Sequence, residues 1–198
     1  MQYLPIFMDV KNKPVLVVGG GEVASRKVDL LLSAKAKVTV VSPQFSDMLT
    51  RYADTGKITQ IIDGYDNKYL ADSVMVWVTT DNGELNKQIW QECNERRILV
   101  NVADQQELCE FITPSIIDRS PLQIAISSGG RSPVLIRYLR EKLEAVLPTS
   151  LGTIGEFAGE QREAVQDKFA TVTERRRFWE RFFSSDALDV ADDANESN

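Results

Sequence analysis

A short apolar run that ends in three consecutive glycines constrains the fold of this 198-residue chain more than any other feature of the sequence. The run covers residues 15–18, and the glycines at 19–21 follow it directly. A continuous apolar run predicts a parallel strand buried on both faces, and the glycines predict a tight turn at its end. Between residues 22 and 34 apolar side chains recur at steps of three and four, so an amphipathic helix is predicted next.

The alternation of strand and helix continues to about residue 102. We predict further strands over 38–41, 58–62, 74–78 and 98–102, with a helix over 84–96. Strands that alternate with helices are joined by right-handed crossovers, which place the strands parallel in one sheet. The predicted fold class is therefore α/β, with a Rossmann-type doubly wound parallel sheet.

The second half of the chain has a different pattern. Two strand-like runs, 110–113 and 122–126, precede a flexible turn of serine and glycine at 127–131. Ser132 and Pro133 then predict a helix start, because serine is a common cap and proline is favoured at the first helical position. Helices are predicted over 133–146, about 151–167 and about 173–183.

Composition excludes several kinds of chemistry. The chain has no histidine, which excludes Ser-His-Asp and Cys-His nucleophile pairs, His-ligated zinc or haem, and any imidazole acid or base. The cysteines, Cys93 and Cys109, form no CxxC pair, so we predict no metal site. The chemistry must therefore use carboxylates, hydroxyls, thiols or a bound cofactor.

The net charge of −6 is unevenly distributed along the chain. Five acidic residues and no basic one fall within 186–198, which predicts a solvated, disordered tail. The rest of the chain is close to neutral and has no coherent basic stripe, so we expect no nucleic-acid partner. No apolar run approaches the ~20 residues of a transmembrane helix, and the start lacks a signal-peptide pattern, so we expect no membrane association and a cytoplasmic location.

Residues 19–24 fit the pattern G-x-G-x-x-A between a predicted strand and a predicted helix, which is the context of a dinucleotide site. Gly19 would permit the tight turn, Gly21 would let a pyrophosphate approach the backbone, and Ala24 would let the helix lie against the strand. Free amides at the helix start would face the anion. The alternative is a glycine turn without a nucleotide, and we favour dinucleotide binding.

The end of the second predicted strand lacks the acidic residue that usually holds the ribose of NAD. Ser42 and Gln44 stand there and can hydrogen-bond a ribose, but they give no charge-based choice between NAD and NADP. Thr80 ends the fourth predicted strand, at the edge where cofactors bind in such sheets. It is either a cofactor contact or a polar cap for the next helix, and the sequence leaves both open.

Asp104 is the candidate catalytic base. It follows the strand predicted over 98–102, so it would lie at the same edge of the sheet as the glycine loop. A carboxylate beside a bound nicotinamide is placed to take a proton as a hydride leaves the substrate. The alternative is an ordinary loop aspartate that caps a turn.

Several motifs occur in the order found in one known family. They are the segments 4–7, 17–27, 101–104, 114–121 and 127–134, and the similarity continues through 140–144 and 174–180. Together they resemble the siroheme synthase N-terminal module, the precorrin-2 dehydrogenase/sirohydrochlorin ferrochelatase family. The resemblance covers nearly the whole chain except the acidic tail.

The resemblance implies NAD-dependent oxidation of precorrin-2 to sirohydrochlorin, followed by insertion of Fe²⁺, as a substrate, to give siroheme. It also implies a homodimer that packs through the second half of each chain. By the same resemblance, Asp104 would be the shared catalytic carboxylate. Further residues would line the NAD site, namely Glu22, Val23, Pro43 and Gln44.

Three residues of the second half are assigned to the substrate. Arg119 and Arg131 fall in a modestly basic segment, and arginine forks suit the carboxylates of precorrin-2 and sirohydrochlorin. Ser128 matches a serine that the family associates with phosphorylation, which would oppose the binding of a polyanion. The alternative interpretation of Ser128 is that it belongs only to a flexible turn of serine and glycine. For chelation the tetrapyrrole supplies the nitrogen ligands, so no permanent His/Cys metal cage is expected.

These expectations divide the chain into four parts. They are an NAD-binding Rossmann domain at 1–113, a dimerisation and substrate-binding segment at 114–147, a helical module at 148–185 and the acidic tail at 186–198. Two alternative functions stay open: a precorrin-2 dehydrogenase without chelatase activity, and an NAD-sensing regulatory module. Fused enzymes of the family continue into a uroporphyrinogen methyltransferase domain, and because this chain stops at Asn198 no methyltransferase activity is predicted.

Overall fold

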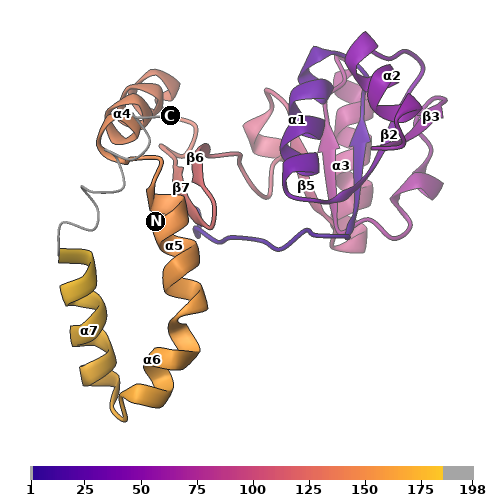
Figure 1. Cartoon of the computed structure of the whole chain (residues 1–198). Helices are drawn as coiled ribbons and strands as arrows, with labels where there is room; N and C mark the ends of the chain where they lie inside the picture. The colour runs from indigo at the N-terminus through magenta and orange to yellow at the C-terminus, as the bar shows by residue number, and fades with distance from the viewer. Residues whose placement is uncertain (1, 185–198) are drawn as a thin grey trace. The chain divides into compact units, whose positions relative to one another are not determined.

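The computed structural model describes residues 2–184, and the predicted acidic tail at 186–198 lies outside the described residues. The chain divides after Ile112 into two compact units (Figure 1). The first holds a parallel sheet with its helices, and the second holds a hairpin followed by helices.

The first unit is built on a five-stranded parallel sheet with the strand order β3-β2-β1-β4-β5. Its strands are β1 (Pro14–Val18), β2 (Lys37–Ser42), β3 (Thr59–Ile62), β4 (Met75–Val78) and β5 (Leu99–Val102). Its helices are α1 (Glu22–Ser33), α2 (Asp47–Asp54) and α3 (Gly83–Arg96), with short 3₁₀ turns η1 (Asn67–Leu70) and η2 (Gln106–Leu108). The strand order reverses at β1, between β2 and β4, and in such sheets this switch point is where ligands bind. The predicted Rossmann-type sheet is confirmed.

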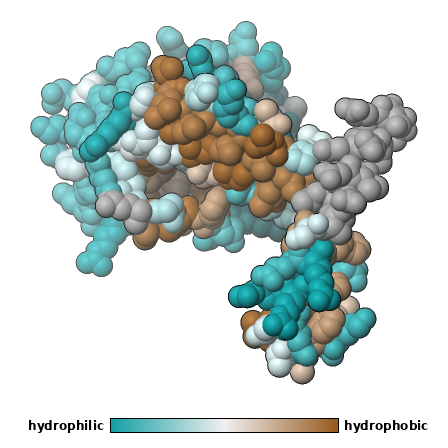
Figure 2. Space-filling model, turned by 90° about the vertical axis from the view of Figure 1, so that its left-hand side faces the viewer, coloured by the Kyte–Doolittle hydropathy of each residue, from teal (hydrophilic) through white to brown (hydrophobic). Residues whose placement is uncertain are grey.

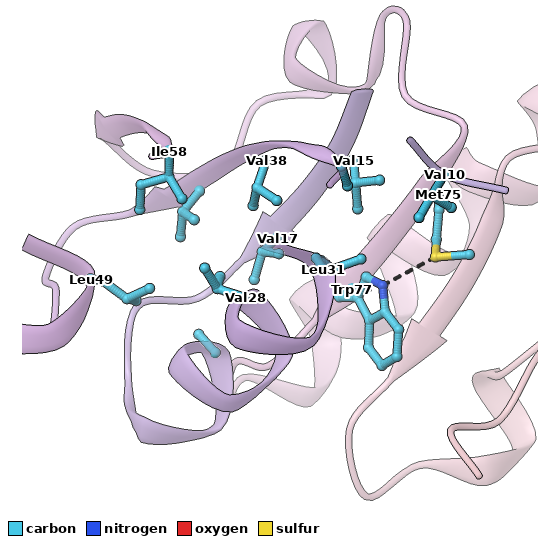
Figure 3. Packing of buried hydrophobic residues seen from close by; sticks show 13 residues of the cluster. Val10, Val15, Val17, Val28, Leu31, Val38, Leu49, Ile58, Met75 and Trp77 are labelled. Atoms are coloured by element: carbon cyan, nitrogen blue, oxygen red, sulfur yellow. Dashed lines mark hydrogen bonds between the residues drawn. The ribbon is translucent and has the colours of Figure 1, made fainter. Parts of the chain in front are cut away.

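The central strand β1 is buried on both faces, as its continuous apolar sequence predicts. Val17 packs on one face in a cluster with Val28 of α1 (Figure 3). Leu16 packs on the other face in a cluster with Ile89 of α3. Because helices cover both faces, the sheet exposes its functional groups only at the ends of its strands.

The second unit starts with an antiparallel hairpin of β6 (Ser115–Arg119) and β7 (Leu122–Ile126). Four helices follow, α4 (Pro133–Val146), α5 (Leu151–Glu160), α6 (Arg162–Lys168) and α7 (Val172–Ser184). A Cβ atom on Gly152 would lie 2.7 Å from the carbonyl oxygen of Ser120, so α5 packs tightly on the hairpin turn. Apolar side chains stay exposed in this unit, and Figure 2 shows hydrophobic surface on the side turned to the viewer. On α4 the exposed apolar residues are Val134, Leu135, Tyr138, Leu139 and Val146.

Two sequence predictions for local structure are wrong. Residues 110–113 form no strand; Val100 donates its N–H to the Glu110 carboxylate (2.7 Å) and the Asn101 amide donates to the Phe111 carbonyl (2.8 Å), so side chains replace a regular ladder beside β5. The helix expected over 151–167 is divided at Gln161 into α5 and α6. The predicted start of α4 is confirmed, with Ser132 at the N-cap position and Pro133 as the first helical residue, although the Ser132 side chain makes no capping hydrogen bond.

Candidate functional site

The carboxyl ends of β1, β2, β3 and β4 surround a cleft of about 510 Å³. The cleft gathers five residues that the sequence assigned to the cofactor: Gly19, Gly21, Pro43, Gln44 and Thr80. Glu22 and Val23, also assigned to it, are the first residues of α1, directly after the glycine loop. The topological switch point and the glycine loop therefore coincide at one open site.

The three glycines of the loop have three different functions. Gly19 has a φ of +115°, which residues with a side chain rarely adopt. Gly20 touches the next loop, because a Cβ atom there would collide with the carbonyl oxygen of Gln44 and lie 2.9 Å from the Ser42 hydroxyl. Gly21 is in the extended region, and nothing lies within 4 Å of the position of its Cβ. Gly21 is thus the position where open space remains for a ligand.

The start of α1 provides hydrogen-bond donors for an anion. Gly21 is the residue before the helix and has no side-chain cap, so the first-turn amides are not occupied by a capping group. These amides and the positive end of the helix dipole attract a phosphate. The open space at Gly21, the uncapped helix start and the cleft beside them fit the pyrophosphate of a dinucleotide.

The glycine loop is fastened to the loop that follows β2. Gly19 donates its N–H to the Val41 carbonyl (2.9 Å), and Ser46 donates its N–H to the Gly20 carbonyl (2.7 Å). The hydroxyls of Ser25 and Ser46 lie 2.8 Å apart in a further hydrogen bond. Sequence reasoning did not identify Ser46, the N-cap of α2, because the eight residues of that helix are too short to show a clear apolar period.

The end of β4 contributes Thr79 and Thr80 to the cleft. Thr79 donates its hydroxyl to the Val18 carbonyl (3.1 Å), which joins the ends of β4 and β1. The Thr80 hydroxyl bonds to the buried Asn86 side chain of α3, and Asn86 donates back to the Thr80 carbonyl (3.0 Å). Thr80 therefore lines the cleft and is bonded to α3, but it is not the cap of that helix: the N-cap is Asn82, whose side chain accepts a hydrogen bond from the Leu85 N–H.

Tyr65 forms part of the cleft wall that the sequence did not predict. It follows β3, and its hydroxyl donates to the Glu92 carboxylate of α3 across 2.6 Å. Gln88 donates to the other oxygen of Glu92 (2.9 Å), so the carboxylate is held from two sides. Burial, with the Glu92 bond next in size, raises the pKa of Tyr65 well above its usual value. The ring is therefore a neutral, fixed wall of the cleft.

Asp104 lies at the carboxyl end of β5, the strand next to β4. Ala103 donates its N–H to the Val78 carbonyl (2.8 Å), so Asp104 stands one residue beyond this contact between the two strand ends. Its side chain is exposed, and its φ of +59° is in the left-handed region. Asp104 is not one of the residues that line the cleft; it occupies the same sheet edge one strand away.

Lys27 of α1 is a half-buried cation close to Asp104. Its Nζ lies 4.8 Å from the centroid of the Trp77 ring, over the end of β4. Burial, with the neighbouring Arg26 next in size, lowers the pKa of Lys27, while the Asp104 carboxylate acts in the opposite direction. The proximity of Lys27 to Asp104 could not be predicted from the sequence, because Lys27 occupies a position typical of the polar side of an amphipathic helix.

The substrate candidates Arg119, Ser128 and Arg131 belong to the second unit. Arg119 ends β6, and its Nε is buried without a hydrogen-bond partner among the described residues. Ser128 accepts a hydrogen bond from the Ser132 N–H (2.9 Å), and the exposed Arg131 lies between them in the chain. Ser128 and Arg131 thus share the loop before α4, and Arg119 is on the hairpin.

Three family models match the chain in succession. Residues 6–115 match a model described as "Putative NAD(P)-binding", 119–145 one described as "Sirohaem biosynthesis protein central", and 150–197 one described as "Sirohaem synthase dimerisation region". The chain belongs to the siroheme synthase N-terminal module family. The match to the NAD(P)-binding model covers nearly all of the first unit. The family's dimerisation region lies C-terminal to the range 114–147 that the sequence assigned to dimerisation.

Curated relatives of this family are similar over the whole chain. Siroheme synthase of Pseudoalteromonas atlantica is 48% identical over 197 residues, which is 100% of this chain and 43% of the relative. Siroheme synthase 3 of Aeromonas hydrophila is 51% identical over 191 residues, covering 96% of this chain and 41% of the relative. The chain therefore spans less than half the length of these relatives.

A solved structure described as "SirC, precorrin-2 dehydrogenase" has the same fold. Its TM-score is 0.77 at 24% sequence identity, and the match covers 93% of this chain and 91% of that chain.

Within residues 2–184, no helix of this siroheme synthase module is long and apolar enough to cross a bilayer.

Proposed function

We propose that the chain oxidises precorrin-2 to sirohydrochlorin with NAD and then inserts Fe²⁺ to give siroheme. The observation that carries the proposal is the shared sheet edge, where the glycine cleft lies at the ends of β1 and β4 and Asp104 lies at the end of β5. A dinucleotide site and a carboxylate one strand apart are what a hydride and proton removal requires. The siroheme synthase family supplies the substrate class.

The residues that would hold NAD follow from the cleft. The uncapped start of α1 would hold the pyrophosphate through backbone amides, with Gly21 leaving room for it. Ser42 and Gln44 would contact a ribose, and Tyr65 would form the wall of the cleft after β3. When bound, NAD supplies a hydride acceptor.

Asp104 would perform the proton transfer of the oxidation. Removing two hydrogens from the macrocycle releases one hydride and one proton, and the proton passes to the Asp104 carboxylate. The exposed side chain of Asp104 leaves it open to a substrate at this edge. The half-buried Lys27 adds a positive charge near this edge of the sheet.

Binding of a polycarboxylate tetrapyrrole would use Arg119, Arg131 and the Ser128 loop. Arg119, whose Nε is buried, would meet a carboxylate through its terminal guanidinium nitrogens, and the exposed Arg131 can meet one as a fork. In a homodimer formed through the second unit, the exposed apolar side chains of α4 would be covered. Substrate and dimer are thus both assigned to this unit.

Chelation would require few protein groups beyond those of the oxidation. The macrocycle provides the nitrogen ligands, and Fe²⁺ replaces two pyrrole protons that need a base. The exposed Asp104 carboxylate would accept these protons one at a time and release each to solvent, which makes one carboxylate common to both reactions. No group of three or more Cys, Asp or Glu side chains suited to a resident metal occurs in residues 2–184, so the iron would be handled only as a substrate.

The deciding experiment mixes the purified chain with anaerobically generated precorrin-2 and NAD and follows sirohydrochlorin by absorbance. We expect product with the wild type and a loss of at least 100-fold in rate for Asp104→Asn, since general base catalysis contributes about 10²–10⁴-fold. Absence of NAD-dependent product would overturn the dehydrogenase. If an Asp104→Asn variant that binds NAD retained the full biological function of the protein in cells, the NAD-sensing module would be favoured, because that function needs no catalytic base.

The second arm adds Fe²⁺ to sirohydrochlorin and subtracts the non-enzymatic rate. An accelerated rate that Asp104→Asn removes supports chelation by the same carboxylate. A rate equal to the non-enzymatic one would leave a dehydrogenase without chelatase activity.

A further inference from the structure

The turn that carries Asp104 has its own backbone bond, from the Gln105 N–H to the Val102 carbonyl (3.4 Å), and the thiol of Cys109 adds further contacts to it. The Cys109 Sγ accepts a hydrogen bond from the Val102 N–H (3.3 Å) and lies 3.2 Å from the Val102 carbonyl, to which it donates. The Gln105 carbonyl lies 3.3 Å from the same sulfur, and the Asn101 amide donates to it across 3.5 Å. One side chain therefore contacts polar atoms before and after Asp104.

The backbone of the turn is unusual at Asp104. Its φ of +59° is in the left-handed region, which aspartate adopts more readily than most residues with a side chain but less readily than glycine. The far side of the turn is also fixed, because the Asn101 amide donates to the Phe111 carbonyl (2.8 Å). Backbone bonds also hold the turn, from the Ala103 N–H to the Val78 carbonyl (2.8 Å) and from the Gln105 N–H to the Val102 carbonyl (3.4 Å). Cys109 adds the side-chain contacts to Val102 and Gln105, on either side of Asp104.

A thiol is suited to this position in a way that other side chains are not. It is both a weak donor and a weak acceptor, and sulfur makes these contacts at longer distances than oxygen does. Burial raises the pKa of Cys109, so the group stays a neutral thiol that keeps its proton for a carbonyl. A serine hydroxyl can also donate and accept, but its C–O bond is shorter than the C–S bond of cysteine, so it would reach the same backbone atoms less well.

We propose that Cys109 is a positioning residue that holds the Asp104 carboxylate in place for proton transfer. The inference rests on the proposed function, because it assigns Cys109 to the reaction only through Asp104. Cys109 itself does not touch the substrate.

Cys93 provides a matched control in the same unit. It is a fully buried thiol of α3 whose pKa is also raised by burial, and it packs in the core cluster beneath the helix. Cys109→Ala and Cys93→Ala therefore remove the same atom, one from the Asp104 turn and one from the core. Cys109→Ser tests rescue by a shorter donor and acceptor.

The first measurement compares kcat, KM and the NAD dissociation constant for precorrin-2 oxidation. We expect Cys109→Ala to lower kcat by about 10- to 100-fold, the order of effect that a misplaced catalytic group produces, with NAD affinity unchanged. Cys109→Ser should recover part of the loss. Cys93→Ala should keep the wild-type kcat even where it lowers thermal stability. Wild-type kcat in a folded Cys109→Ala variant would overturn the proposal and leave the dehydrogenase assignment intact.

The second measurement is a double-mutant cycle with Asp104→Asn. If Cys109 acts through Asp104, Cys109→Ala has no further effect on the residual rate of Asp104→Asn. An equal fold-loss in both backgrounds would show that Cys109 acts independently and would overturn the proposal.

Hydrogen exchange provides a readout that does not depend on activity. The backbone amides of residues 102–105 should exchange faster in Cys109→Ala than in Cys93→Ala or the wild type. Unchanged exchange of the amides of residues 102–105 in Cys109→Ala would show that Cys109 does not hold the turn, whatever the substrate of the chain.

Discussion

Ser46 donates its backbone N–H to the carbonyl oxygen of Gly20 across 2.7 Å, and this bond joins the glycine loop to the loop after β2. The Ser25–Ser46 hydroxyl bond (2.8 Å) reinforces the junction. Two walls of the cleft are therefore one connected structure, and the space at Gly20 is already occupied by its neighbours. The space at Gly21 is open, so the two glycines should respond differently to substitution.

Gly20→Ala should damage the fold and the NAD site together. The new Cβ would collide with the Gln44 carbonyl and crowd Ser42, and overpacking of this kind costs about 1–3 kcal/mol. Denaturant unfolding and an NAD titration should both show the loss. Gly83→Ala is the control: nothing lies within 4 Å of its Cβ position at the start of α3, so stability should be unchanged or slightly raised. Equal unfolding stability and equal NAD affinity of Gly20→Ala and Gly83→Ala would contradict the close contact between the glycine loop and the loop after β2.

Gly21→Ala should leave the fold intact and weaken NAD binding. Its backbone is in the extended region, which alanine adopts readily, and no atom lies within 4 Å of the added Cβ. The methyl group would occupy the space through which the pyrophosphate approaches α1. We expect the unfolding midpoint of the wild type with an NAD dissociation constant raised at least tenfold. Wild-type affinity would place the pyrophosphate elsewhere.

Much of the first unit follows from local sequence patterns. The continuous apolar run of β1 can be read directly because a strand covered by helices on both faces has no polar side to confuse its pattern. Helix α2 was missed, since its eight residues are too short for a clear apolar period. Residues 110–113 look like a strand, yet the Glu110 and Asn101 side chains take the bonds that a partner strand would provide.

Only the site residues that closely follow a strand in the chain could be predicted from the sequence. Gly19, Gly21 and Thr80 follow strands directly, so topology places them at one edge. Tyr65 and Lys27 depend on packing between elements far apart in the chain, with Tyr65 bonded to Glu92 and Lys27 over Trp77. No local pattern encodes such contacts, because the same residues read as loop or helix surface.

Tyr65 should contribute to NAD affinity through its ring. Tyr65→Ala removes a wall of the cleft, and we expect about a tenfold rise in the dissociation constant, equivalent to about 1.4 kcal/mol. Tyr65→Phe keeps the ring but loses the 2.6 Å bond to Glu92, so it should lower stability more than affinity. Tyr69→Phe is the matched control, because it loses a 2.7 Å bond to the exposed Asp63 outside the cleft. An affinity loss for Tyr69→Phe as large as for Tyr65→Ala would contradict the assignment.

Lys27 should make stability depend on pH. Its pKa is lowered in the folded chain, chiefly by burial, so between that value and about 10.5 the unfolded chain binds more protons. The cost of the half-buried charge is therefore complete at lower pH and disappears as pH rises through this window. Unfolding of the wild type and Lys27→Met should be compared from pH 7 to 10.5. The free energy of unfolding of the wild type should rise relative to the variant; a constant difference would rule out the linkage.

Arg119 should matter for the substrate more than for the fold. Its Nε is buried with no hydrogen-bond partner among residues 2–184, and such a group costs about 1–3 kcal/mol. Arg119→Met keeps the packing of the stem, so stability should be unchanged or raised by about 1 kcal/mol. The KM for precorrin-2 should rise about tenfold or more, since a charge-assisted contact to carboxylates is lost. Arg137→Met on α4 is the control, because its exposed ion pair with Glu141 at 3.9 Å is worth little. A stability loss in Arg119→Met with an unchanged KM would make Arg119 a structural residue of the hairpin.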